Sequence, residues 1–222
     1  MCLILIYRDV EMETEAYTLP VFGISRHRMN TDGQGVTTLI GAVGCELRCR
    51  YCANPIAWNE SLPKTVKFLS AEELYDKVKE DNLYFLATGG GVTFGGGEGL
   101  LHAVFYPAFR KVCGTEWHLA VETSLNVSRE LLKTSLDAID EYIIDIKDIN
   151  PEIYRAYTGQ DNNQVLENLT FLLQHKNVEN IFVRVPRIPK FNTDEDIEKT
   201  VEYLRQIGVK RIEVFPYTIV KN

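Results

Sequence analysis

Short apolar runs rich in β-branched residues alternate along this chain with amphipathic stretches. Apolar runs of this kind predict strands, and amphipathic stretches with a period near 3.6 residues predict helices. The predicted strands cover residues 37–43, 91–94, 118–123, 138–147 (around the core YIIDI), 181–185 and 211–216. The predicted helices cover residues 70–83, 100–112, 128–135, 151–157, 165–175 and 194–207. Ser70 and Glu73 form a candidate capping box, and Pro107 is expected to interrupt its helix.

The order of these elements gives six strands, each followed by helical sequence except the last. Runs such as YIIDI and IFVRV are apolar on both faces, as in strands of a parallel sheet that helices cover. The chain is therefore expected to be an α/β protein with right-handed crossovers. Six units are too few for an eight-stranded barrel, which leaves an open, partial barrel or a doubly wound sheet. In both folds the chemistry belongs at the carboxyl ends of the strands.

Length and composition fit one globular domain, with 222 residues that are 45% hydrophobic and 25% charged. The net charge of −7 argues against a nucleic-acid binder, which usually presents a basic face. The first residues hold only a short apolar run, residues 2–7, followed by acidic residues, which predicts neither a signal peptide nor a membrane span. We therefore expect a cytoplasmic protein with no membrane partner, with an N-terminal extension (residues 1–20) and a single domain (residues 21–222).

Three of the five cysteines, Cys45, Cys49 and Cys52, fall within eight positions in the spacing C-x3-C-x2-C. An odd count is unlike a secreted disulfide scaffold, and clustered thiols in a reducing compartment usually bind metal or act in catalysis. Three thiolates could hold three irons of a [4Fe–4S] cluster and leave the fourth iron open. They could also belong to a structural zinc site, or remain unligated. The fourth zinc ligand would then be distant, from the set Cys113, His27, His102, His118 and His175.

A glycine block follows the second predicted strand and ends in a carboxylate: Gly95, Gly96, Gly97 and Glu98. The block lacks the lysine and the Ser/Thr of a phosphate-binding loop. Glycines at this density favour a close approach of the backbone to a ligand, although a tight turn alone would also need them.

Charged side chains occupy the later predicted strands. Asp145 and Lys147 are two positions apart and so point to the same side of an extended strand, which indicates a lined cavity or a buried ion pair. Glu122 lies near the end of the strand HLAVET, where a carboxylate satisfied by its own chain is the simplest interpretation. Arg184 lies in IFVRV, where a surface ion pair is the simplest interpretation.

The cysteine motif carries the aromatic Tyr51 directly before its third cysteine, and so resembles the signature of the radical S-adenosylmethionine enzymes. The wider sequence resembles the activating enzymes of glycyl radical enzymes, the group of pyruvate formate-lyase activating enzyme and its relatives. The matching segments, in order, are DGQGVTTLIGAVGCELRCRYCANPIAW (32–58), GGGVTFGGGEGLL (89–101), VETS (121–124), IIDIK (143–147), VRVPRIPKFN (183–192) and IEVFPY (212–217). The resemblance covers about residues 21–217 and implies an open, partial (β/α)6 barrel.

By this resemblance the chain holds a single [4Fe–4S] cluster on three cysteines, with S-adenosylmethionine on the open iron. The residues implied to be catalytic are Cys45, Cys49, Cys52 and Lys147, and the three cysteines are the implied metal ligands. The residues implied to bind cofactor are Tyr51, Gly96, Gly97, Glu98, Glu122, Thr123, Asp145, Lys147 and Arg184.

The resemblance also implies individual roles. The block of residues 96–98 receives the amino group of S-adenosylmethionine, and Lys147 lies beside its carboxylate. Glu122 stands where aspartate is usual, a position associated with that carboxylate, sometimes through a monovalent cation. Asp145 borders the substrate channel, and Arg184 points to the cavity mouth.

The implied reaction is reductive cleavage of S-adenosylmethionine to a 5′-deoxyadenosyl radical, which abstracts a hydrogen atom from a backbone glycine of a partner glycyl radical enzyme. A flavodoxin- or ferredoxin-type protein would donate the electron under anaerobic conditions. An alternative is radical modification of a small molecule or peptide with the same cofactors. A third hypothesis, from a different class, is a non-catalytic binding module stabilised by zinc.

Three positions depart from the pattern of the activating enzymes. Gln34 replaces the proline of a usual GPG segment, Ala53 follows the third cysteine where histidine or serine is common, and Thr218 stands where histidine is frequent. The departure at Ala53 bears on the choice of substrate, and the departure at Thr218 bears on one adenosine or ribose contact.

Overall fold

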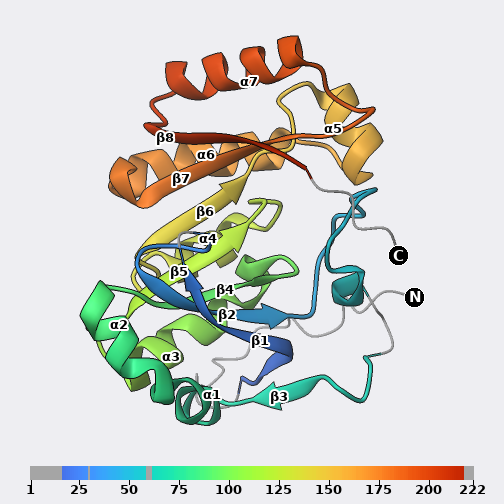
Figure 1. The fold of residues 1–222 in the computed structure, drawn as a ribbon. Coiled ribbons are helices and arrows are strands. Elements are labelled where there is room, and N and C mark those ends of the chain that lie inside the picture. The colour runs from blue at the N-terminus through green and yellow to red at the C-terminus, as the bar shows by residue number, and fades with distance from the viewer. Residues whose placement is uncertain (1–16, 30, 59–61, 218–222) are drawn as a thin grey trace.

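The computed structural model describes residues 17–29, 31–58 and 62–217 of the chain (Figure 1). Within these residues the strands form one eight-stranded sheet with the order β3-β1-β2-β4-β5-β6-β7-β8. The strands are β1 (Leu19–Met29), β2 (Val36–Ala42), β3 (Lys67–Leu69), β4 (Gly91–Gly96), β5 (His118–Thr123), β6 (Glu141–Asp145), β7 (Ile181–Arg187) and β8 (Arg211–Pro216).

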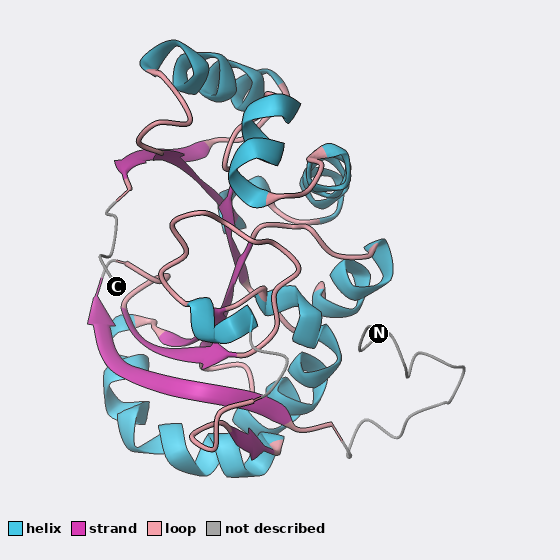
Figure 2. Ribbon diagram, turned by 90° about the vertical axis from the view of Figure 1, so that its right-hand side faces the viewer, coloured by secondary structure: helices cyan, strands magenta, loops and turns pink. Residues whose placement is uncertain are grey.

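Six of these strands, β2 and β4 to β8, run parallel to one another, as the sequence predicted. The sheet is curved and the helices line its outer side (Figure 2). A doubly wound sheet would carry helices on both faces, so this arrangement decides for the open, partial barrel. The predicted fold class is confirmed.

Two strands were not predicted: β1 pairs antiparallel with β2, and β3 pairs antiparallel with the start of β1. β1 is half-exposed over most of its length and has register shifts near Gly23, so its sequence lacks the clear alternation of a strand with one buried face. β3 spans only three residues, which is too short for a periodic signal. Both strands extend the sheet on the side away from β8.

The helices follow the predicted order. They are α1 (Ala71–Val78), α2 (Asn82–Thr88), α3 (Tyr106–Cys113), α4 (Arg129–Ser135), α5 (Pro151–Thr158), α6 (Asn163–His175) and α7 (Asp194–Gln206), with 3-10 segments η1 (Pro55–Trp58), η2 (Lys79–Asp81), η3 (Gly99–Phe105) and η4 (Val178–Asn180). The capping box of Ser70 and Glu73 is present at α1. The interruption predicted near Pro107 is also present, because η3 gives way to α3 at Tyr106.

The single helix predicted over residues 70–83 is wrong, because the structure divides this segment into α1, η2 and α2. Asp81 lies at the division and is 2% exposed. Its carboxylate accepts a hydrogen bond from Thr38 Oγ1 at 2.8 Å and lies 3.6 Å from Arg26 Nε. The contacts with β1 and β2 hold Asp81 against the sheet, and the chain leaves the regular α-helix to meet them.

Residues along the parallel strands alternate between two environments. The outward positions, such as Val121, Tyr142 and Ile144, pack in the hydrophobic core between the sheet and the helices. The inward positions include Glu122, which pairs in register with Ile143 on β6. This alternation puts apolar packing on the outside of the barrel and leaves polar side chains facing its interior.

The amino-terminal end of the barrel interior is closed by the loop between β1 and β2. Thr93 Oγ1 donates a hydrogen bond to the carbonyl oxygen of Asp32, and Arg28 pairs with the Asp32 carboxylate. A methyl group added at Gly33 would touch Ala120 and Thr93. The interior is therefore accessible from the carboxyl ends of the strands. Within the described part of the chain, no helix is long and apolar enough to cross a bilayer.

Candidate active site at the carboxyl ends of the strands

The loop that carries the three cysteines follows β2 and is fixed on two sides. On one side, the backbone N–H groups of Arg48 and Arg50 donate to the carbonyl oxygens of Thr158 and Tyr157, at 2.8 and 3.0 Å. On the other side, the N–H of Glu98 donates to the carbonyl oxygen of Gly44 at 2.7 Å. The cysteine loop is thus held between the end of α5 and the glycine block after β4.

The three cysteines are half-buried and form no disulfide. Burial raises the pKa of all three thiols, and raises that of Cys45 to about 12. For Cys49 the nearby ammonium of Lys147 acts in the opposite direction, favouring the thiolate. The backbone N–H of Asn54 already points at Cys52 Sγ, 3.3 Å away. These thiols need a bound cation to ionise at neutral pH, as cluster ligation provides.

Of the five residues considered as a distant fourth zinc ligand, only His102 contacts the cysteine loop. The other four lie at the amino-terminal edge of the parallel strands: Cys113 and His175 where α3 and α6 end, His118 where β5 begins, and His27 near the end of the antiparallel β1. His102 lies close to the loop, but its Nε2 bonds the carbonyl oxygen of Val43 at 2.7 Å and its Nδ1 bonds Tyr17 Oη at 2.9 Å. In the described residues, no three or more His, Cys, Asp or Glu side chains are grouped to hold a metal ion.

The glycine block makes close backbone contacts with the cysteine loop, and side chains would prevent them. A methyl group at Gly97 would lie 2.1 Å from the carbonyl oxygen of Gly44, well inside van der Waals contact. Gly96 has a φ of 90°, which glycine adopts without strain, and its carbonyl oxygen accepts from Asn54 Nδ2 at 3.1 Å. The backbone of the block therefore lies directly beside the cysteines.

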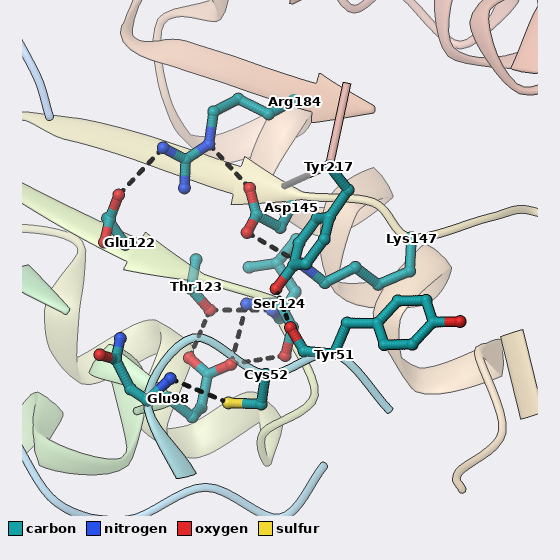
Figure 3. Close-up of polar contacts among 12 residues, drawn as sticks. Tyr51, Cys52, Glu98, Glu122, Thr123, Ser124, Asp145, Lys147, Arg184 and Tyr217 are labelled. Carbon is teal, nitrogen blue, oxygen red and sulfur yellow. Dashed lines mark hydrogen bonds and ion pairs between the residues drawn. The ribbon is translucent and has the colours of Figure 1, made fainter. Parts of the chain in front are cut away.

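Glu98 ties the glycine block to the loop after β5 (Figure 3). The side chain is 2% exposed, and its two carboxylate oxygens accept four hydrogen bonds. The donors are Thr123 Oγ1 at 2.5 Å, Ser124 Oγ at 2.6 Å, Ser124 N at 2.8 Å and Leu100 N at 3.1 Å. Burial raises the pKa of Glu98, and these donors oppose the rise by stabilising the charged form. Thr123 thus lies in the site through its bond to Glu98.

Four charged side chains, on or just after β5, β6 and β7, form a chain of ion pairs inside the barrel (Figure 3). Arg184 bridges two carboxylates, with Nη1 3.0 Å from Glu122 Oε1 and Nε 2.7 Å from Asp145 Oδ1. Lys147 Nζ lies 2.9 Å from Asp145 Oδ2. The buried ion pair foreseen for the IIDIK segment is present, and Arg184 belongs to the interior rather than to the surface.

The electrostatics of this chain follow from burial and pairing. Burial alone would raise the pKa of Asp145, but Lys147 and Arg184 together hold it below its ordinary value. Burial raises the pKa of Glu122, and Arg184 opposes the rise. Burial lowers the pKa of Lys147, but Asp145, Cys49 and Tyr217 together outweigh that effect, so the pKa is raised and the ammonium keeps its proton. The interior therefore presents a protonated lysine and an arginine to an anionic group.

Several aromatic residues with no role assigned from the sequence meet at the cysteine loop. Tyr217 Oη, just after β8, donates to the carbonyl oxygen of Tyr51 at 2.5 Å (Figure 3). The Tyr51 ring packs edge-on against Tyr157 and Phe191, with ring centroids 6.1 and 5.7 Å apart. These partners come from three distant segments, so no local pattern signals them. The hydrogen bond ties the last strand to the cysteine loop across the barrel mouth.

The three departures from the family pattern have different positions. Gln34 is exposed and its amide lies beside Gly89, at the end of the barrel away from the cysteines. Ala53 is exposed and follows Cys52 directly, so it borders the site. Thr218 lies outside the described residues.

The comparisons with known proteins agree with this geometry. The family model described as "Radical SAM superfamily" matches residues 39–219, and the chain belongs to this superfamily. Its curated relatives are activating enzymes. It is 35% identical over 196 residues to the pyruvate formate-lyase-activating enzyme of Clostridium pasteurianum, covering 84% of this chain and 77% of the relative. It is 29% identical over 251 residues to the (2S)-3-sulfopropanediol dehydratase activating enzyme of Klebsiella oxytoca, covering 86% and 78%. The predicted family is confirmed.

Solved structures of low sequence identity share the fold. The structure of Streptococcus suis SuiB bound to precursor peptide SuiA has a TM-score of 0.61 at 12% identity, over 81% of this chain and 38% of that chain. QueE from Escherichia coli has a TM-score of 0.50 at 13% identity, over 94% and 100%. At this identity the likeness supports the partial barrel and nothing more.

Membership of the superfamily implies a [4Fe–4S] cluster and S-adenosylmethionine, and the residues of the cysteine loop fit the cluster. Three thiols share one half-buried loop, and a backbone N–H is directed at one of them. On α5, the helix whose end is bonded to this loop, the hydroxyl of Tyr154 is buried without a hydrogen-bond partner among the described residues. A buried group that needs a partner, on a helix bonded to the loop whose thiols need a cation, is what a cluster-binding pocket requires.

Proposed function

We propose that this protein is an activating enzyme whose Cys45, Cys49 and Cys52 hold three irons of the cluster, while the fourth iron takes S-adenosylmethionine. When bound, these cofactors supply one-electron cleavage chemistry, in which an added electron yields methionine and a 5′-deoxyadenosyl radical. That radical takes a hydrogen atom from a backbone glycine of a partner glycyl radical enzyme, giving 5′-deoxyadenosine and a glycyl radical. The observation that carries the proposal is the meeting of the cysteine loop, the glycine block and the interior charge chain at one end of the barrel.

The chain's own groups bind and orient the cofactor. Lys147 stays protonated beside Cys49 and offers donors to the carboxylate of S-adenosylmethionine. Backbone carbonyls of residues 96 and 97 accept hydrogen bonds from the ammonium of S-adenosylmethionine. In the structure the Gly96 carbonyl accepts a hydrogen bond from the side-chain amide of Asn54. Glu98 holds the glycine block in place through its four hydrogen bonds. Tyr51 lies next to the cofactor because it directly precedes Cys52 in the cysteine loop.

A monovalent cation between Glu122 and the cofactor carboxylate remains part of the proposal. In the structure the Arg184 guanidinium supplies positive charge at this point, 3.0 Å from Glu122. The cation would add to that charge, since two facing carboxylates repel. Titrating S-adenosylmethionine binding in potassium, sodium and choline buffers tests this: equal affinity in all three would remove the cation from the site.

The protein partner is proposed from the relatives and supported by the open barrel. Curated relatives at 29–35% identity include activating enzymes of pyruvate formate-lyase, of (2S)-3-sulfopropanediol dehydratase and of choline trimethylamine-lyase. The described sheet has β3 and β8 as its two edges, so the barrel is not closed by pairing between its first and last strands. A backbone glycine on a loop of a large partner needs this kind of access. We further propose a flavodoxin- or ferredoxin-type donor and a reducing, cytoplasmic location, which keeps the thiols available.

The test is an anaerobic reconstitution with iron and sulfide, followed by reduction and addition of S-adenosylmethionine. The expected results are a [4Fe–4S]⁺ electron paramagnetic resonance signal that changes on adding S-adenosylmethionine, and formation of 5′-deoxyadenosine. Cys49→Ala is expected to lose the cluster absorbance, and Cys113→Ala, at the opposite end of the barrel, is expected to keep it. With the partner present, a glycyl radical signal should appear. Tight zinc without iron in the purified protein would refute the proposal in favour of a zinc-stabilised module.

A second candidate keeps the cofactors and changes the substrate to a small molecule or peptide. Ala53 favours it, because this exposed residue borders Cys52 and differs from the family pattern. Product analysis separates the two candidates. Deuterium transferred from a labelled glycine residue of a partner protein into 5′-deoxyadenosine supports the activating enzyme, and transfer only from a small molecule or short peptide supports the second.

A further inference from the structure

Helix α5 (Pro151–Thr158) is docked directly on the cysteine loop. Its last carbonyl oxygens accept the N–H groups of Arg48 and Arg50, which flank Cys49 in the sequence. A methyl group at Gly159, just after the helix, would lie 3.9 Å from Arg48 Cβ. Both N–H groups beside Cys49 are therefore fixed to this helix, which holds its carboxyl-terminal turn against the cysteine loop.

Two tyrosines of α5, Tyr154 and Tyr157, are buried, and neither hydroxyl has a hydrogen-bond partner among the described residues. The Tyr157 ring packs against Tyr51 and Tyr217, which leaves Tyr154 as the candidate. It lies one turn before Thr158, whose hydroxyl donates to the Tyr154 carbonyl oxygen at 2.8 Å. Its side chain is 0% exposed. A buried hydroxyl without a partner is costly, so a native structure that keeps one usually has a partner that is absent from the coordinates.

The acidic groups around this hydroxyl narrow the identity of that partner. Burial raises the pKa of Tyr154, and Cys49, Glu98 and Cys45 add to that rise. Glu98 already accepts four hydrogen bonds. The two thiols are proposed ligands of the cluster. A neutral thiol is a weak acceptor, whereas a metal-bound thiolate is a much better one.

We propose that the hydroxyl of Tyr154 donates a hydrogen bond to sulfur on the Cys49 side of the bound cluster, and that this hydrogen bond raises the reduction potential of the cluster. The proposal rests on the proposed function, because it requires the cluster. Reduction adds one negative charge to the cluster, and a hydrogen bond to sulfur stabilises the more negative state. Tyr154 is therefore a positioning residue that makes the cluster easier to reduce by a protein electron donor.

The experiment compares the midpoint potential of the reconstituted cluster in the wild-type protein and in Tyr154→Phe, by titration followed with electron paramagnetic resonance. The matched control is Tyr142→Phe. Tyr142 is also 0% exposed, but its hydroxyl is paired with Ser135 at 2.7 Å and it lies at the start of β6, away from the cysteines. Iron content and absorbance establish that each protein carries the cluster before any potential is compared.

Tyr154→Phe is expected to lower the midpoint potential. When both proteins are held at the midpoint potential of the wild type, the ratio of reduced to oxidised cluster should be lower by about threefold or more in Tyr154→Phe. For a one-electron couple this corresponds to a midpoint shift of about 28 mV. Tyr142→Phe should leave the potential unchanged. Equal potentials in wild type and Tyr154→Phe, with the cluster present in both, would overturn the inference and leave the proposed function intact. Failure of the wild-type protein to assemble any cluster would overturn both.

A second substitution covers the case in which Tyr154→Phe fails to assemble the cluster. 3,5-Difluorotyrosine at position 154 keeps the ring and hydroxyl and makes the hydroxyl a stronger donor. The midpoint potential should then shift upward, opposite to the effect of phenylalanine. A hydroxyl that only fills space would give no upward shift, and that result would overturn the inference.

Discussion

Glu98→Gln is the most direct test of how the site is held together. The native carboxylate accepts four hydrogen bonds inside a buried pocket, two on each oxygen. Glutamine has nearly the same shape but only one acceptor oxygen. With that oxygen facing Thr123 and Leu100, the new NH₂ group faces the backbone N–H of Ser124, and two donors oppose each other.

The magnitude follows from the groups left without partners. A buried donor that loses its acceptor costs about 1–3 kcal/mol, and hydrogen bonds to a charged group are worth about 1.5–3 kcal/mol against about 1 kcal/mol for neutral ones. Ser124 N loses its acceptor, and the remaining bonds lose the charge that strengthened them. We expect a loss of about 3 kcal/mol in the free energy of unfolding, or a Tm lower by about 6–12 °C for a chain of this size.

The assay is thermal unfolding of the metal-free protein under reducing conditions, followed by circular dichroism. Glu195→Gln is the control, because Glu195 is exposed and pairs only with Lys199 on the surface of α7, so its Tm should move by less than about 2 °C. The glutamine variant should also bind S-adenosylmethionine more weakly once reconstituted, since the glycine block is no longer tied to the loop after β5. A Tm shift for Glu98→Gln no larger than that of the control would refute this account.

Three further predictions concern other parts of the site. Gly97→Ala should lower the Tm and the iron content after reconstitution, because its methyl group would lie 2.1 Å from a backbone carbonyl oxygen. Gly23→Ala is the control and should lower neither, because a methyl group there would meet nothing within 4 Å. Equal iron content in the two variants would contradict this prediction. Burial holds the pKa of His102 at about 4, below its ordinary 6.5, so the free energy of unfolding should be fully present above about pH 6.5 and fall as the pH drops toward about 4, by up to about 1.4 kcal/mol per pH unit. Urea titrations between pH 4 and 7 measure that slope, and His102→Gln should reduce it. Arg184→Gln leaves the interior carboxylate of Glu122 without its ion-pair partner and leaves Asp145 paired with Lys147 alone. It should lower the free energy of unfolding by about 2 kcal/mol or more, which an unchanged urea midpoint would rule out.

Most of the fold could be predicted because its signals are local. The apolar run YIIDI becomes β6 within a residue or two at each end, and the capping box of Ser70 and Glu73 begins α1 as expected. The helix over residues 70–83 could not be predicted, because Asp81 leaves it to meet Thr38 on β2, which is 43 positions away in the sequence. A tertiary contact there outweighs helix propensity.

The site divides in the same way. The sequence by itself determined the residue types: three closely spaced thiols, a block of glycines, and charges on the later strands, each at a carboxyl end where parallel strands bring their chemistry together. The resemblance carried by those motifs named the family, which the comparisons confirmed. The spacing of the cysteines alone left iron and zinc open.

Only the tertiary structure decided which of these groups touch. Arg184 bridges Glu122 and Asp145 because three neighbouring strands align them on one inward face. Tyr217 reaches the carbonyl oxygen of Tyr51 across 166 positions of sequence, and the end of α5 binds the backbone on both sides of Cys49. Strand register and helix docking set these contacts, and both depend on the packing of the whole barrel, so no local run of sequence encodes them.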